Sequence, residues 1–192
     1  MHTSTLIGGA LALSWVFSGA AAAANYVIDT QGAHASILFR VQHLGFSWLT
    51  GRFNQFEGQF DYDEQNPRAA RVTVTIDTAS VDSNHAERDK HLRSDDFLNV
   101  RQYPQAQFNS TGFEPTGDDT GLLTGDFTLN GITKPLTIHV RDIGSGPDPW
   151  GGYRHGFTGT TQFALADYGI TFNLGPKSKV VELELHVEGI RQ

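Results

Sequence analysis

The chain has 192 residues with no Cys, and its 14 Lys and Arg against 21 Asp and Glu give a formal charge of −7 at pH 7. The absence of Cys excludes disulfides, thiolate metal sites, covalent haem attachment and Cys nucleophiles. The acidic balance argues against a nucleic-acid partner and against electrostatic docking on anionic lipid, because both rest on Lys and Arg that face phosphates.

Residues 1–24 predict a signal peptide. The stretch Leu6–Ala24 is apolar and small, and it ends in Ala22-Ala23-Ala24, a pattern that suits signal peptidase. No Lys or Arg precedes the apolar stretch, which departs from the usual signal peptide. The alternative is a membrane anchor, but a helix that spans a membrane needs about 20 apolar residues. We expect cleavage after Ala24, secretion without stable membrane insertion, and one mature domain over residues 25–192.

Beyond the leader, apolar residues alternate with polar ones almost everywhere, which predicts β-strands. The expected strands centre on residues 37–43, 56–62, 72–76, 108–110, 123–129, 136–140, 157–163 and 181–187. Asn130-Gly131 is a strong hairpin signal between two of them. About eight strands in one domain favour a closed antiparallel barrel or a sandwich, so the fold class is mainly β.

The inner faces of these strands are rich in Phe, with Gly at several central positions. Gly in a strand interior often marks a bend or a close approach of another group. A barrel of about eight strands is just wide enough to fill itself or to hold one slender ligand. The pattern alone leaves both interpretations open.

Two apolar loops flank the predicted strands. Residues 144–152 contain Trp150, which we expect to tuck into the end of the barrel, although it is also placed to cap a cavity. Phe46, Trp48 and Leu49 follow the first predicted strand and are expected in a loop or short helix.

The segment Asn84–Asn99 is a charged helical insertion in this β-rich chain. Asn84 or Ser83 is the expected N-cap, and a break near Ser94 is expected to turn Phe97 and Leu98 inward. Two roles stay open: a solvated helix across one end of the barrel, or part of a polar mouth. The residues that the second role would use are Arg88, Asp89, His91 and Arg93.

Catalytic and metal-binding motifs are weak in this sequence. It contains no G-x-S-x-G elbow, P-loop or dinucleotide fingerprint. No two His residues stand in an H-x-H or H-x-x-x-H pair, so we predict no metal site and no catalytic residue. His43 is the His of most interest, because it ends a strand on the inner face, where a neutral imidazole needs a partner.

Short motifs recur in a fixed order along the chain: His34-Ala35-Ser36, Phe39, His43-Leu44-Gly45, Ser80-Val81-Asp82, Arg88-Asp89, His91-Leu92, Asp96-Phe97, Pro104, Phe108-Asn109-Ser110, Leu129-Asn130-Gly131, Lys134-Pro135 and Asp148-Pro149-Trp150-Gly151. In order and spacing they resemble the YceI-like family, the secreted lipocalin-like barrels that bind polyisoprenoids and similar lipids. The resemblance covers essentially residues 25–192, and it is to the periplasmic members with a cleaved signal, which implies a periplasmic location. It implies a single lipocalin-like antiparallel barrel with one short helical insertion and an apolar tunnel.

The resemblance also implies a non-covalent ligand with a polyprenyl, quinone or fatty-amide tail, and no covalent cofactor. Strand parity then predicts the tail contacts: Phe39, Val41, Phe60, Val74, Ile76, Phe108, Phe127 and Phe163. The predicted contacts at the polar end of the ligand are His43, Arg88 and His91. We expect sequestration or carriage of the lipid, with a role in stress response, and no chemical step.

Two other functions remain as alternatives. The first is an enzyme that acts on an isoprenoid lipid and uses His43, His91 or Asp89 as acid–base groups. The second is a periplasmic interaction protein whose acidic outer face binds a partner. A homodimer and a cytochrome partner are left open by the sequence.

Overall fold

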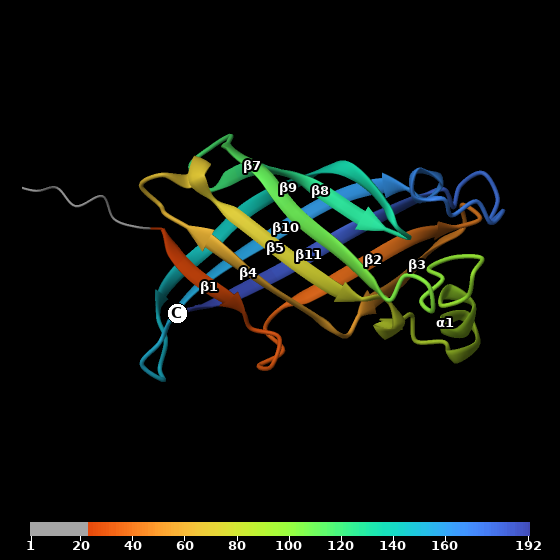
Figure 1. The fold of residues 1–192 in the computed structure, drawn as a ribbon, viewed down its shortest axis with the longest axis horizontal. Coiled ribbons are helices and arrows are strands. Elements are labelled where there is room, and N and C mark those ends of the chain that lie inside the picture. Colours follow the sequence, from red (N-terminus) through yellow and green to blue (C-terminus); the bar gives the residue numbers. More distant parts are fainter. Residues whose placement is uncertain (1–22) are drawn as a thin grey trace, which may run out of the picture.

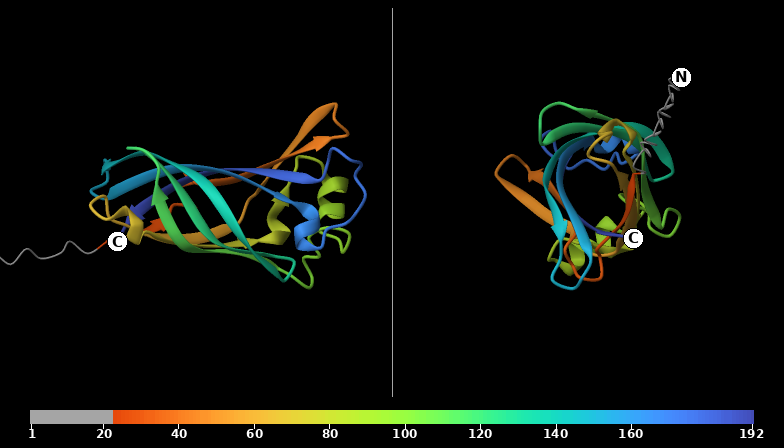
Figure 2. Two further views of the ribbon diagram at one scale, coloured as in Figure 1. Left: turned by 90° about the horizontal axis from the view of Figure 1, so that it is seen from above. Right: turned by 90° about the vertical axis from the view of Figure 1, so that its left-hand side faces the viewer.

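The computed structural model describes residues 23–192, which form a closed antiparallel barrel of eight strands with one short α-helix at one end (Figures 1 and 2). The barrel strands are β1 (Ala24–Ile28), β4 (Phe56–Tyr62), β5 (Arg71–Asp77), β7 (Gln105–Pro115), β8 (Thr120–Leu129), β9 (Ile132–Pro147), β10 (Tyr153–Ala164) and β11 (Val180–Arg191). The remaining elements are β2 (Ser36–His43), β3 (Ser47–Phe53), β6 (Val81–Asp82), α1 (Ala86–Leu92) and the 3-10 helices η1 (Pro67–Ala69), η2 (Thr78–Ser80) and η3 (Leu165–Tyr168).

Strand β11 closes the ring by pairing with two strands along one edge. Its last residues pair with β1, where Tyr26 lies opposite Arg191, and its first half pairs with β2, where Val41 lies opposite Val181. At the end that carries α1, β2 continues into β3, which pairs with β6. Closure leaves few free strand edges, which would otherwise invite pairing with other chains.

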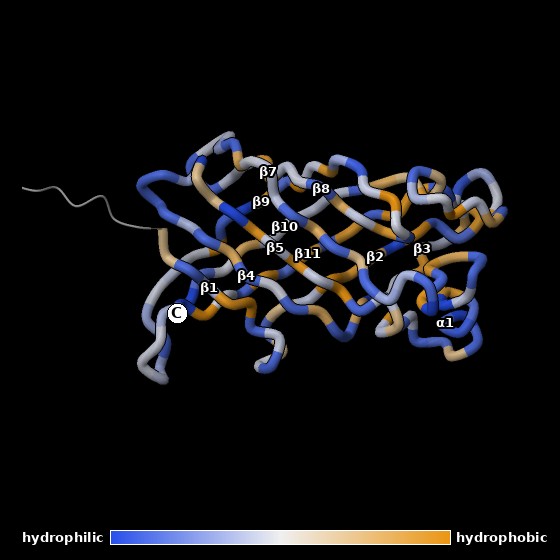
Figure 3. Tube along the Cα trace, viewed as in Figure 1, coloured by the Kyte–Doolittle hydropathy of each residue, from blue (hydrophilic) through white to orange (hydrophobic). Residues whose placement is uncertain are grey.

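The alternating pattern directs apolar side chains into the barrel. Ile37, Phe39 and Val41 of β2 lie opposite Leu185, Leu183 and Val181 of β11, and all six line the interior. Figure 3 shows hydrophobic and hydrophilic residues alternating along the strands. All eight predicted strands are present, and the predicted Asn130-Gly131 hairpin joins β8 to β9 with positive φ at both residues.

The prediction of a loop or short helix over Phe46, Trp48 and Leu49 is wrong for Trp48 and Leu49, which belong to β3, whereas Phe46 lies in the turn between β2 and β3. The chain turns at Leu44 and Gly45, whose φ angles are 53° and 85°, and the amide of Phe46 donates to the carbonyl of His43 at 2.9 Å. Such turns usually carry Asn or Gly at both central positions. Leu44 gives no such signal, and β3 was missed for that reason.

The predicted helix forms over α1, but its N-cap is His85 and not Asn84 or Ser83. The Nδ1 atom of His85 accepts a hydrogen bond from the amide of Arg88 at 3.2 Å. The Ser83 hydroxyl is not free for this role, because it donates to the buried carboxylate of Asp89. Asn84 has a φ of 60°, which does not fit the extended backbone of an N-cap.

The break after α1 is confirmed. The carbonyl of Ser94 accepts from the amides of Phe97 and Asn99 at 3.2 and 2.8 Å, and this turn buries Phe97 and Leu98. Arg93, at the end of α1, donates to the carbonyls of Ala79 and Val81 at 2.7 and 2.6 Å. Because these bonds reach η2 and β6, the helix is fixed to the rim of the barrel.

The expected position of Trp150 inside the barrel end is wrong. Its side chain is 75% exposed, and it stacks against the guanidinium of Arg154 at 5.2 Å. Residues Gly144–Pro147, predicted as loop, instead extend β9 and pair with β10. The short turn that follows holds Trp150 outside, because Asp148 accepts from the amides of Trp150 and Gly152.

The predicted signal peptide, residues 1–24, lies outside the described residues except at its end, where Ala24 begins β1. Within residues 23–192, no helix is long and apolar enough to cross a membrane.

Candidate functional site: an apolar cavity along the barrel axis

A cavity of about 780 Å³ lies inside the barrel at the end that carries α1. Its wall is formed mainly by β2, β3 and β11, by α1 and the turn after it, and by the chain between η3 and β11, with further side chains from β5, β7, β8 and β10. Most of the side chains that line it are apolar. A volume of this size falls in the range of small-molecule binding sites, roughly 300–1,000 Å³.

A second cavity of about 140 Å³ lies deeper along the axis. Four residues line both cavities: Ile37, Ile76, Phe127 and Leu183. The two spaces therefore follow one another along the barrel with a shared constriction. This arrangement fits a long, slender apolar chain better than a compact ligand.

The predicted tail residues all face these two spaces. Phe39, Val41 and Phe163 line the main cavity, Phe60, Val74 and Phe108 line the deep one, and Ile76 and Phe127 line both. The predicted inner face of each strand is therefore confirmed, and contact of these residues with a ligand stays a prediction.

The rim of the main cavity carries the three residues predicted for the polar end. His43, Arg88 and His91 all border it, and they come from the end of β2 and from α1. Arg88 donates to the hydroxyl and carbonyl of Ser83 at 2.7 and 2.6 Å, so its position is fixed. The structure thus brings these residues to one opening.

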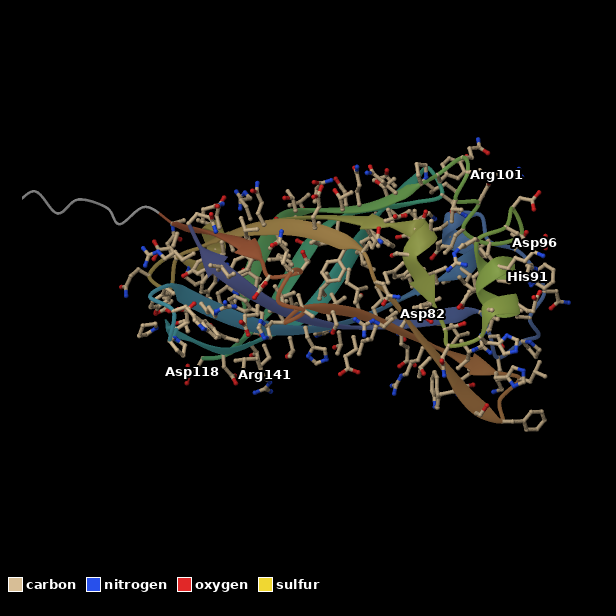
Figure 4. All side chains as sticks on the ribbon, turned by 90° about the horizontal axis from the view of Figure 1, so that it is seen from below. Asp82, His91, Asp96, Arg101, Asp118 and Arg141 are labelled. Carbon is tan, nitrogen blue, oxygen red and sulfur yellow. The ribbon has the colours of Figure 1, made fainter. Side chains whose placement is uncertain are left out.

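His91 links the helix to the turn that follows it. Its Nε2 lies 2.9 Å from Oδ2 of Asp96, and both residues are labelled beside α1 in Figure 4. Its ring meets Phe97 and Phe172 edge-on, with centroids 4.9 and 5.0 Å apart. His91 therefore joins α1 to the turn after it and to the chain around Phe172 at the rim of the cavity.

The three residues named for the acid–base alternative lie in different surroundings. Asp89 is buried and accepts from both the amide and the hydroxyl of Ser83, so it stabilises the start of α1. It does not line either cavity. His43 and His91 border the opening.

The opposite end of the barrel is closed by aromatic side chains. His155 is buried, stacks on Phe157 with centroids 4.4 Å apart, and meets Tyr26 and Tyr62 edge-on. Its Nε2 lies 2.8 Å from Oδ2 of Asp142. Burial raises the pKa of both tyrosine hydroxyls. This packing ends the deep cavity.

A charged cluster fastens the same end. Arg154 donates to Asp29, Asp148 and Glu188 at 2.7, 3.0 and 2.5 Å. The bond from Arg154 to Asp29, followed by the bond from His34, holds the pKa of Asp29 at about 2, below its ordinary 3.8. Among residues 23–192, Asp29, His34 and Glu188 also have the spacing of metal ligands. Because Arg154 already bonds to both carboxylates, we assign this cluster to barrel closure.

A polar groove of about 900 Å³ runs over the outer side of β2, β3, β10 and β11. It is larger than the internal cavity, but its floor is charged: Arg40 pairs with Glu182 at 2.7 Å, and Asp82 accepts from Asn84 and Asn54 at 2.9 and 3.1 Å. These groups satisfy one another. We therefore place the candidate site in the apolar interior.

Several cavity residues were missed from the sequence. They lie on β3 and on the chain from η3 to β11: Leu49, Phe53, Leu165, Ile170, Leu174 and Ser178. The signal for β3 was present as Leu49, Gly51 and Phe53 at alternate positions. The residues after η3 follow no period, because that segment folds as irregular turns over the opening.

Fold and cavity together define a small antiparallel β-barrel with an internal apolar binding space. The YceI-like domain family matches residues 26–189, and the chain belongs to this family. It is 58% identical over 189 residues to a UPF0312 protein of Shewanella sp. (strain ANA-3), with 98% of this chain and 97% of that protein covered. A UPF0312 protein of Shewanella baltica (strain OS185) is 57% identical over the same length and coverage.

Solved structures show the same fold. Burkholderia cenocepacia BcnA matches with a TM-score of 0.75 and 22% identity, covering 84% of this chain and 98% of that one. The Campylobacter jejuni YCEI protein matches at 0.68 and 25%, covering 79% and 90%. A polyisoprenoid-binding domain from Saccharophagus degradans, implicated in plant cell wall breakdown, matches at 0.63 and 16%, covering 88% and 99%.

Proposed function

We propose that this protein binds a long-chain lipid of polyisoprenoid type, with its tail in the barrel and its head at the α1 end. The observation that carries the proposal is the pair of consecutive apolar cavities with the polar rim at one end only. The fold shared with a domain described as polyisoprenoid-binding gives further support. Polyprenyl, quinone and fatty-amide tails all fit the apolar chemistry of the interior.

Energetics support the proposed binding. Each CH₂ group moved from water into the cavity contributes about 0.8 kcal/mol. Tens of carbons would therefore offset the several kcal/mol lost in immobilising the ligand. His43, Arg88 and His91 would then select the head group by hydrogen bonds, and their contribution to affinity would be the smaller one.

In this proposal the lipid is held or carried without a covalent step, and the protein acts in the periplasm after cleavage at Ala24. An apolar lipid tail that leaves a membrane must be shielded from water, and the interior of the closed barrel would shield it. A role in stress response is part of the same proposal. N-terminal sequencing of the secreted protein should give Asn25 as the first residue.

Native mass spectrometry tests lipid binding directly. Delipidated protein would be mixed with a long-chain polyprenol, a quinone and a fatty amide, each in turn. We expect a one-to-one complex with at least one of them, and none with a polar analogue that carries the head group alone. Absence of every complex, with the protein folded by circular dichroism, would contradict the proposal.

A further inference from the structure

The β2–β3 hairpin projects from the barrel wall beside the cavity opening, as Figure 2 shows in orange. At its tip, Phe46 is 87% exposed, Leu44 is 51% exposed and Trp48 is 45% exposed. Monomeric proteins seldom expose several large apolar side chains together unless the patch has a function. The patch adjoins the cavity, because Leu44 also lines the opening.

The backbone holds this tip in an unfavourable conformation. Leu44 has a φ of 53°, a region that L-residues other than Asn and Asp seldom adopt. Asn or Gly would make the same turn without strain. Strain of this kind concentrates at functional positions. A large apolar side chain is therefore kept on the tip at a conformational cost.

A second loop, residues 171–179, packs against the tip. The hydroxyl of Ser178 donates to the carbonyl of Gln42 at 2.5 Å and lies 3.5 Å from the amide of Leu44. A Cβ atom on Gly45 would lie 3.4 Å from Cγ of Lys177. Phe172 of this loop is also exposed. The hairpin and the loop therefore form one surface, which we call the portal patch: residues 43–48 and 171–179.

The charge of the portal patch differs from that of the whole protein. The chain has a formal net charge of −7 at pH 7, yet residues 43–48 and 171–179 contain no carboxylate and include Lys177 and Lys179. The acidic side chains beside the patch are bonded within the protein. Asp96 lies 2.9 Å from His91, whose ring contacts Phe172. Glu182 pairs with Arg40, whose guanidinium stacks on Trp48. Aromatic and aliphatic side chains flanked by Lys are the composition that enters the interface of a bilayer with anionic head groups.

We propose that the portal patch docks the protein on an anionic phospholipid bilayer, with Phe46, Leu44 and Trp48 at the acyl–head-group boundary. This docking rests on the proposed function, since it places the cavity opening where a lipid tail would pass between membrane and barrel with little exposure to water. Docking is peripheral and reversible, and it requires only the hairpin tip and Lys177 with Lys179.

The test uses delipidated protein and vesicles of phosphatidylethanolamine with phosphatidylglycerol, or of phosphatidylcholine alone. The Trp150→Phe background makes Trp48 the sole tryptophan after the leader. We expect flotation with the anionic vesicles and a blue shift of Trp48 fluorescence. Phe46→Ser should weaken vesicle binding about tenfold or more, and Lys177→Glu should weaken it on anionic vesicles only.

Ile143→Ser is the matched control, because Ile143 is 63% exposed on β9, toward the closed end of the barrel. Its vesicle binding should equal that of the wild type. Lack of binding by the wild type, full binding by Phe46→Ser, or an equal loss in Ile143→Ser would each overturn docking. So would a dimer that Phe46→Ser abolishes in ultracentrifugation without any vesicle binding, which would assign the patch to a second copy.

Tail binding is measured separately, by native mass spectrometry of the same variants with polyprenol and without vesicles. Retained tail binding with absent docking rejects the docking proposal alone. Retained docking with absent tail binding rejects the proposed function alone, and the portal patch would then hold the protein on the bilayer without transferring a lipid.

Discussion

Arg154 donates a hydrogen bond of 2.7 Å from Nη1 to Oδ2 of Asp29, and this contact joins the start of β10 to the chain just after β1. Asp29 is 7% exposed and also accepts from the amide of Gly32 at 2.8 Å. The pair lies at the closed end of the barrel, where β1 completes the ring. It therefore links β1 to β10 across the end of β11, the strand that pairs with both.

Replacing Asp29 by Asn should destabilise the protein at neutral pH. The pKa of Asp29 is lowered in the folded state from 3.8 to about 2, so its ionised form stabilises the fold by roughly 2 kcal/mol above pH 4. This stability is lost as pH falls from about 4 through 2, and the wild type and Asp29→Asn should converge there. Urea unfolding at stepped pH measures the difference.

Asp119→Asn is the control for this experiment, because Asp119 forms an exposed pair with Arg141 at 2.5 Å. Exposed pairs contribute little to stability, so this variant should unfold close to the wild type at every pH. An Asp29→Asn variant with the same pH profile as the wild type would show that Arg154 does not set the charge state of Asp29.

A methyl group on Gly125 should disturb the packing of the barrel wall. A Cβ atom there would lie 2.5 Å from Cζ of Phe108 and 2.6 Å from the carbonyl oxygen of Asn109. Gly125→Ala should therefore cost about 1–3 kcal/mol in the free energy of unfolding. Gly146→Ala meets nothing within 4 Å and should change stability by no more than about 0.5 kcal/mol. Equal effects of the two variants would contradict this assignment.

A larger side chain at Ile76 should shorten the tail that the barrel accepts. Ile76 lines both cavities, so Ile76→Phe narrows the passage from the main cavity to the deep one. We expect affinity for long polyprenols to fall about tenfold while short-chain isoprenoids bind as before, measured over a series of chain lengths. Thermal unfolding of the same variant checks that the barrel is intact. An unchanged preference for chain length would mean that the tail does not cross this point.

The alternation of side chains along each strand allowed much of the cavity wall to be predicted from the sequence. Residues such as Phe39, Val74 and Phe127 stand at alternate positions of their strands. Successive side chains of a strand point to opposite faces, so the apolar set must lie on the buried face when the other face contacts solvent. The helix was recognisable from its charge and from Leu92, Phe97 and Leu98. These local patterns placed the predicted strands and every predicted tail residue on the cavity wall.

The missed parts depend on contacts between distant segments. The Leu44–Gly45 turn carries no standard turn signal, so β3 and the exposed tip were not recognised. Trp150 was expected inside the barrel end, but its ring stacks on the guanidinium of Arg154 on the outside of the barrel. The cavity wall after η3 includes Ile170 and Leu174. Long-range packing against the core fixes their positions, and the sequence around them shows no regular spacing of apolar residues.

A lipid tail that lies along the barrel axis would be seen most directly in a crystal structure grown with excess long-chain polyprenol. We predict continuous electron density from the opening beside His43 and His91, through the main cavity, to the constriction at Ile76 and Phe127. A barrel whose cavities hold only water, or polyprenol bound solely on the outer surface, would contradict the proposed function.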